Sequence, residues 1–206
     1  MLFGNGNGAL TTSGTYNLNG GILNMTGGNF TKGTGLAFFN FNNGRLQDLG
    51  AYNLGGTFTQ TDGVLAPGPA NSAGVTNINA NFLQQLDGEI ELSLFGSGPG
   101  NFDVINVNGT VSLAGSLSVT NDPIGLALGL IFTIFNNDGA DPISGTFFGL
   151  PEGQDFVSGS GNMFDISYIG GDGNDVRLLV VPEPATGAIL LGATGLLVLF
   201  HRRRLP

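Results

Sequence analysis

Two glutamates, Glu89 and Glu91, are the first residues whose type and spacing suggest chemistry. In the stretch EIEL they alternate with Ile90 and Leu92, so they lie on one face of an extended strand, about 7 Å apart by strand rise. That separation is compatible with the pair of carboxylates in a glycosidase. No aromatic platform or polar cluster flanks them in the sequence. We therefore interpret them as charges on the solvent-facing side of a strand.

The stretch GGDGNDVRL (170–178) suggests a calcium site. In the nonapeptide G-G-x-G-x-D-x-U-x, stacked copies of the repeat bind Ca²⁺ between them. The three glycines of the run fit this pattern, and Asp172 and Asp175 are the candidate ligands. However, Arg177 stands where the pattern needs a large apolar residue, and the run occurs once. The stretch favours a hairpin turn over a calcium site.

Other catalytic chemistry lacks the residues it needs. The chain has no cysteine, its one histidine is His201, and its cations before residue 182 are Lys32, Arg45 and Arg177. A Ser-His-Asp set, a zinc cluster or the basic residue of a polysaccharide lyase therefore cannot be assembled. The glycine-rich run GNGNG (4–8) has no lysine and precedes no predicted helix, so it is read as a turn. The sequence predicts no catalytic residue, no metal, no cofactor and no enzymatic activity.

The charge balance excludes a nucleic-acid partner. Up to Val181 the chain carries 14 acidic residues against those three cations, a net charge of −11. Such a surface has no basic stripe to neutralise phosphates. An acidic, lysine-poor surface rich in asparagine, threonine and serine suits an extracellular protein.

The elements that must position these residues are short strands. The chain of 206 residues contains 37 glycines, and asparagine is frequent, so turns are expected often. Between the glycines, apolar residues alternate with polar ones: Val111, Leu113, Leu117 and Val119 share one face and the intervening serines the other. A period of two is the pattern of half-buried strands. We expect an all-β body.

Two architectures accommodate such strands: a β-solenoid, whose asparagines would ladder inside the turns, and a β-sandwich. Residues 1–74 favour a glycine- and asparagine-rich solenoid. Residues 75–181 are expected to have longer strands and to form either the cap of the solenoid or a β-sandwich-like domain. Residues 182–206 form a separate C-terminal segment. Within the body, the apolar stretch 121–135 is predicted to hold a strand buried on both faces.

The C-terminal segment has the order of a short membrane anchor. The 16 residues from Ala185 to Phe200 carry no charge. As a helix this run reaches about 24 Å, somewhat less than the ~30 Å hydrocarbon core. The arginines that follow place the C-terminus in the cytoplasm and the body outside. The apolar side chains of the run include Ile189, Leu190, Leu191, Leu196, Leu197, Val198 and Leu199, and the three cations after it are Arg202, Arg203 and Arg204.

The stretch VPEP, an apolar run and RRR, in that order at the end of the chain, resembles the PEP-CTERM sorting signal of Gram-negative bacteria. The resemblance implies that Pro182, Glu183 and Pro184 are the recognition element for an exosortase-type processing protease. The apolar run would be a transient span of the inner membrane, and the arginines would stop transfer. It implies an exported protein, anchored in the inner membrane and then released to the cell surface or the extracellular matrix.

The body resembles the autotransporter-associated β-strand repeat passengers in stretches such as GGTFTQTDGVLAPG (55–68) and NGTVSLAGSLSV (108–119). That likeness implies a right-handed parallel β-helix with a structural or adhesive role. The expected partners are an exopolysaccharide or further copies of the chain.

The beginning of the chain, MLFGNGNGALTTSG, lacks the charged and apolar regions of a signal peptide and reads like the repeats of the body. We therefore expect an export signal and earlier repeats upstream. The alternative function is the C-terminal part of a secreted carbohydrate-active enzyme, with its catalytic domain upstream.

Overall fold

The computed structural model describes residues 2–3 and 13–183, and these form strands and loops without a helix. The strands are β1 (Leu2–Phe3), β2 (Ser13–Asn24), β3 (Asn29–Lys32), β4 (Leu36–Gln47), β5 (Ala51–Asn53), β6 (Thr57–Ala66), β7 (Val75–Ile78), β8 (Asn81–Ser93), β9 (Val104–Val107), β10 (Val111–Leu113), β11 (Ser116–Asn121), β12 (Ile131–Asn137), β13 (Ser144–Gly145), β14 (Asp155–Val157), β15 (Met163–Gly170) and β16 (Asp175–Val181).

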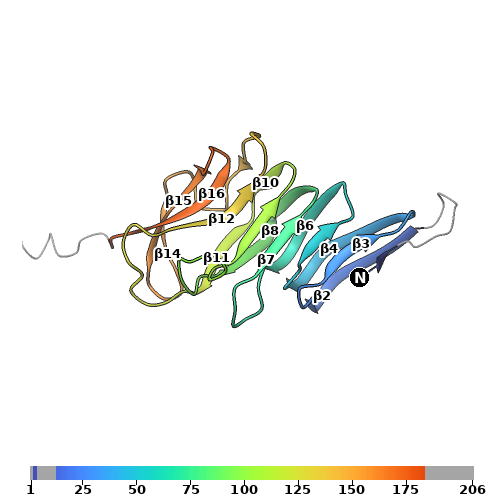
Figure 1. Ribbon diagram of the computed structural model, residues 1–206, viewed down its shortest axis with the longest axis horizontal. Coiled ribbons are helices and arrows are strands. Elements are labelled where there is room, and N and C mark those ends of the chain that lie inside the picture. Colours follow the sequence, from blue (N-terminus) through green and yellow to red (C-terminus); the bar gives the residue numbers. More distant parts are fainter. Residues whose placement is uncertain (1, 4–12, 184–206) are drawn as a thin grey trace, which may run out of the picture.

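From β1 to β10 successive strands alternate between two sheets, which makes the body a β-solenoid of about four turns (Figure 1). One sheet has the order β1-β3-β5-β7-β9-β12-β16-β15-β14. The other has the order β13-β10-β8-β6-β4-β2, with β11 also paired to β8. From β1 to β9 every pairing within a sheet is parallel. The all-β, solenoid prediction is therefore confirmed.

The coils continue without a break across residue 75. β7, which begins at Val75, pairs in parallel with β5 before it and with β9 after it. Long strands occur on both sides of this position, as β4 with 12 residues and β8 with 13. The strands of residues 75–181 are therefore not longer as a group. Beyond β12 the nine-stranded sheet changes to antiparallel pairing, since β16, β15 and β14 form a meander that closes one end of the solenoid, while β13 still pairs in parallel with β10 in the other sheet.

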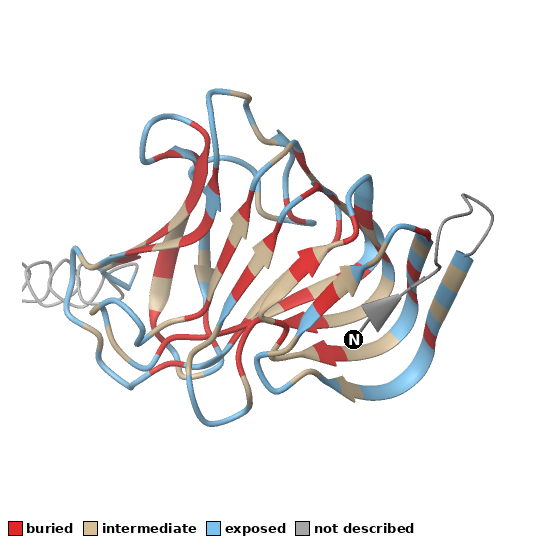
Figure 2. Ribbon diagram, turned by 45° about the vertical axis from the view of Figure 1, so that its right-hand side comes forward, coloured by how far each residue is buried: buried red, intermediate tan, exposed pale blue. Residues whose placement is uncertain are grey.

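The core is one hydrophobic cluster that runs the length of the body between the two sheets (Figure 2). A row of aromatic rings follows this axis. Phe58 contacts Phe82 at 5.8 Å between ring centroids, Phe82 contacts Phe135 at 5.8 Å, and Phe135 contacts Phe147 at 6.1 Å. These four side chains are at most 1% exposed, so each coil contributes apolar area and ring contacts to the next.

A column of glycines marks the corner where the long strands change direction. Gly63 lies beside Gly88 in the register of β6 and β8, and it follows Gly44 of the preceding coil. Gly63 has a φ of +81°, a region that glycine enters without the steric cost of a Cβ. A Cβ placed at Gly63 would also overlap the carbonyl oxygen of Gly44 and lie 2.8 Å from its amide nitrogen. The coils can stack this closely because neither glycine carries a side chain.

Two buried glutamines join successive coils next to this corner. Both Gln60 and Gln84 are fully buried and lie opposite each other in β6 and β8. The amide of Gln60 donates to the carbonyl oxygens of Gly63, in its own coil, and Glu89, in the next, at 2.8 and 2.9 Å. Gln84 repeats the arrangement, donating to Gly88 and Ser116 at 3.0 and 3.1 Å. These side chains supply the hydrogen bonds that buried backbone carbonyls at a bend require.

A buried carboxylate, that of Asp103, joins a loop to the end of a strand through hydrogen bonds from backbone amides. Asp103 is 2% exposed and accepts hydrogen bonds from the amides of Gly74, at 2.7 Å, and Ser93, at 2.8 Å. Burial raises the pKa of Asp103 to about 6, and the two amide donors oppose that rise. Asp103 thereby fixes the loop before β7 against the end of β8.

The prediction of a strand buried on both faces within 121–135 is wrong in part. The strand exists as β12, and Phe132, Ile134 and Phe135 are fully buried. Ile131 is 48% exposed, and Thr133 is half-buried. A bulge opposite β16, between Thr133 and Phe135, turns Phe135 to the same inner face as its neighbours. The strand therefore buries one face only.

Candidate functional site

The outer faces of both sheets carry ladders of asparagine side chains. On the nine-stranded sheet, Asn106 donates to Asn77 at 2.8 Å, and in the bends directly after β9 and β7, Asn108 donates to Asn79 at 2.6 Å. On the other sheet, Asn40 donates to Asn17 at 2.6 Å. The expected position in the turns is therefore confirmed for Asn79 and Asn108, whereas the other two pairs lie on strands. The alternation of the strands sends asparagine outward because the core face is filled by apolar residues.

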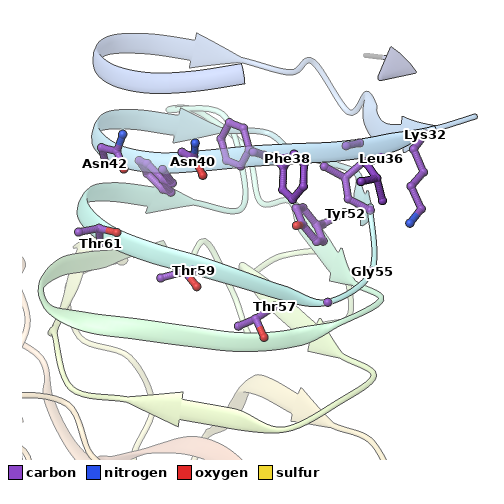
Figure 3. A pocket seen from close by; sticks show the side chains of 15 residues that line it. Lys32, Leu36, Phe38, Asn40, Asn42, Tyr52, Gly55, Thr57, Thr59 and Thr61 are labelled. Atoms are coloured by element: carbon purple, nitrogen blue, oxygen red, sulfur yellow. The ribbon is translucent and has the colours of Figure 1, made fainter. Parts of the chain in front are cut away.

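A groove of about 480 Å³ lies where β4 and β6 separate (Figure 3). Both strands begin earlier, at Leu36 and Thr57, but their pairing starts only at Phe41 and Gln60. The gap exposes side chains of several elements to one space. The lining includes Lys32 at the end of β3, Phe38, Asn40 and Asn42 on β4, Tyr52 on β5, and Thr57, Thr59 and Thr61 on β6.

The groove combines aromatic, hydroxyl, amide and amine groups. Phe38 is 49% exposed, although it belongs to a strand whose neighbouring residue Phe39 is buried. Tyr52 is buried against Phe58, with ring centroids 4.9 Å apart, and burial raises the pKa of its phenol. Lys32 is the cation of the lining. Small-ligand sites are usually concave with mostly apolar walls; this groove is concave, but polar groups make up at least half of its exposed lining.

The carboxylates of β8 are already engaged on the outer face. Arg45 makes a bidentate ion pair with Glu91, with Nη2 to Oε1 at 2.7 Å and Nη1 to Oε2 at 3.0 Å. Hydrogen bonding with Glu91 raises the pKa of Arg45. Glu89 accepts a hydrogen bond from the hydroxyl of Ser118 at 2.5 Å. Glu91 therefore joins β8 to β4 across the intervening strand β6, and Glu89 joins β8 to the neighbouring strand β11.

The run GGDGNDVRL forms a hairpin, as predicted. β15 and β16 pair antiparallel, and Gly170 lies opposite Asp175. Asp175 is buried and accepts a hydrogen bond from the amide of Asn137 at 3.0 Å, while Asp172 is exposed on the turn. Burial raises the pKa of Asp175. Within the described part of the chain, no three acidic or histidine side chains gather in a way that could hold a metal ion.

The predicted sorting signal begins where the folded body ends. β16 ends at Val181, and Pro182 and Glu183 follow it as the last described residues, both exposed. Residues 2–3 and 13–183 contain no helix suited to crossing a membrane. The rest of the predicted signal lies outside the described residues, namely Pro184, the span from Ala185 to Phe200, and the stop-transfer arginines Arg202, Arg203 and Arg204.

Comparison of the chain with protein-family models, with curated proteins and with solved structures finds no match.

Sequence reasoning missed the groove because its residues come from separate strands. Lys32, Phe38 and Tyr52 belong to β3, β4 and β5, and each is ordinary in its local sequence. One local signal existed: Phe38 and Phe39 are adjacent, so one of two large aromatic residues in a half-buried strand must point outward. An exposed aromatic on a strand face is a residue that a search for binding sites should inspect.

Proposed function

We propose that the chain is an exported bacterial surface or extracellular-matrix protein with a structural or adhesive role, sorted through its C-terminal segment. The observation that carries the proposal is the position of the motif. The last strand ends at Val181, and the Pro-Glu-Pro sequence starts at the next residue. A recognition element must be reachable by its protease, and a proline-rich joint directly after a folded body is both extended and accessible.

Further features support a role outside the cell. The body is an acidic solenoid, and solenoids expose long lateral surfaces to partners. Its strand-face carboxylates Glu89 and Glu91 are used to join coils rather than held in a cleft. We also propose that the coils of the solenoid are right-handed and that the C-terminal segment is a PEP-CTERM sorting signal.

Replacing Pro182, Glu183 and Pro184 together with alanine tests the sorting step. We expect the variant to stay in the membrane fraction with an intact C-terminus, because the protease has lost its recognition element. The parent chain should be released after losing the arginine end. Cell fractionation with mass spectrometry of the C-terminal peptide measures both. Normal release of the alanine variant, or a released parent chain that keeps Arg202 to Arg204, would contradict the proposal.

The groove between β4 and β6 favours an exopolysaccharide as the extracellular partner. Its exposed Phe38 offers an apolar face, and the threonines and asparagines of its rim offer donors and acceptors for sugar hydroxyls. Lys32 could pair with a sugar carboxylate. The same groove would serve a carbohydrate-active enzyme with its catalytic domain upstream, which is the alternative function.

Phe38→Ala tests the groove in affinity electrophoresis through gels that contain dextran or alginate. We expect the parent protein to be retarded by at least one polysaccharide and the variant to bind about tenfold more weakly, about 1.4 kcal/mol. Phe148→Ala is the control, since Phe148 is 73% exposed and does not line the groove. Equal retardation of the parent and the Phe38 variant would remove the groove from the proposal.

A further inference from the structure

The loop between β11 and β12 exposes large apolar side chains. Ile124 is 88% exposed and Leu128 is 64% exposed. Exposing two large aliphatic side chains in one short loop is costly unless another surface covers them. The position of this loop in the fold indicates which surface covers these side chains.

The loop is held in this conformation by a polar network. Asp122 is buried and accepts hydrogen bonds from Ser158, at 2.6 Å, and from the side chain of Asn162, at 2.5 Å. Asn162 in turn accepts a hydrogen bond from the amide of Leu126 at 3.0 Å. At the end of the loop, the amide of Gly129 donates to the carbonyl oxygen of Val180 at 2.9 Å. Both ends of the loop are thus fixed, so its apolar side chains are presented outward by a built structure.

The loop lies beside the point where the chain leaves the body. A groove of about 330 Å³ is lined by Ile124, Leu126 and Leu128 on one side and by Val181 and Glu183 on the other. The register of the sheet extends this apolar surface, because Val181 lies opposite Met163, and Met163 lies opposite Val157, which is 59% exposed. We call Ile124, Leu128, Val157, Met163 and Val181 the exit patch. It is at the end of the body that carries β14 to β16, opposite the end with β2 (Figure 1).

In the proposed anchored state, the short joint of residues 182–184 places the exit patch next to the bilayer. The uncharged run starts at Ala185, two residues after Glu183, and two residues span at most about 7 Å. A body tethered so closely must hold the surface around its exit point against the bilayer. That surface is the exit patch, whose five residues are uncharged, whereas the body as a whole has a net charge of −11 that an anionic membrane repels.

We propose that the exit patch inserts into the lipid interface while the protein is anchored, with Ile124 and Leu128 entering the boundary between headgroups and acyl chains. This inference rests on the proposed membrane-anchored stage. Glu183, and Asp165 two residues after Met163 on β15, limit the depth of insertion to the interface, because their carboxylates remain in water. The patch thereby orients the body on the membrane and keeps the Pro-Glu-Pro joint at the bilayer surface.

The absence of tryptophan from the chain allows a direct test. The full chain carrying Leu128→Trp is reconstituted into phosphatidylcholine vesicles that contain dibrominated phosphatidylcholine. Ile124→Trp is a second reporter, in case Leu128→Trp disturbs the loop. Ile22→Trp is the matched control, because Ile22 is an exposed aliphatic residue on β2, at the opposite end of the body. We expect blue-shifted emission and strong quenching for the two loop reporters, and neither for Trp at position 22.

The outcomes separate this inference from the function on which it rests. If the full chain floats with the vesicles and the loop reporters are neither shifted nor quenched, the inference is overturned and the anchor stands. Blue-shifted emission without quenching also overturns it, because the patch is then covered by protein, either a second copy or the C-terminal run. If the chain does not float, the anchor is overturned, and the inference with it.

Discussion

Gly63→Ala is expected to lower the free energy of unfolding by roughly 3–5 kcal/mol. The backbone at Gly63 has a φ of +81°, which costs an alanine about 1–2 kcal/mol. The new methyl group would also overlap the carbonyl oxygen of Gly44 in the neighbouring coil. Because this contact is with backbone, no side chain can rotate away, and two coils must separate. Urea unfolding of the full chain in mild detergent, followed by circular dichroism, measures the loss.

Gly56→Ala isolates the packing contribution. Gly56 has a similar φ of +70°, but a Cβ there would meet no atom within 4 Å. The control should therefore lose only the conformational cost, about 1–2 kcal/mol. Equal losses for the two variants would mean that the glycine column does not set the spacing between coils.

The second large effect is expected at Gln84. Gln84→Ala removes a fully buried side chain that donates to the carbonyl oxygens of Gly88 and Ser116 and accepts from the amide of Gly115. Each buried polar group left without a partner costs about 1–3 kcal/mol. We expect the free energy of unfolding to fall by about 3–5 kcal/mol, part of it from the cavity that the substitution leaves. Urea unfolding under the same conditions measures this loss.

Gln85→Ala is the matched control for Gln84, since the adjacent residue has the same type but an exposed side chain. We expect a change within about 0.5 kcal/mol, the usual range for surface substitutions. A loss at Gln84 no larger than the one at Gln85 would show that the buried amide does not hold the coils together.

Both substitutions act on the joint between coils, which is where a solenoid is vulnerable. Each coil contacts mainly its neighbours, so stability is nearly a sum over coils and the interfaces between them. Gly63 and Gln84 lie at two different interfaces, separated by the pairing of β6 with β8: Gly63 faces β4, and Gln84 faces β11 across its hydrogen bond to Ser116. A body that serves as a spacer or an adhesive surface outside the cell needs these interfaces intact.

The strands and one hairpin were predictable from the amino-acid order, whereas the sorting role of the C-terminal segment stays a prediction. Strand alternation is a local property, because successive side chains point to opposite faces, and it identified the buried faces of β8 and β10 correctly. The hairpin at 170–178 followed from its glycines, for the same local reason. The Pro-Glu-Pro motif, apolar run and arginines are contiguous, so the sorting prediction needed no tertiary information.

Which residues of different coils meet emerged only from the folded chain. Parallel pairing joins Phe41 to Gln60, 19 positions apart, but Val75 to Val104, 29 positions apart. With so variable an offset, no fixed repeat in the sequence could align Gly44 with Gly63, or Arg45 with Glu91. The groove at Phe38 and the exit patch at Leu128 depend on the same alignment. The physical reason is that stacking is fixed by the volumes and hydrogen bonds of side chains that are distant in sequence, while the local pattern fixes only which way each one points.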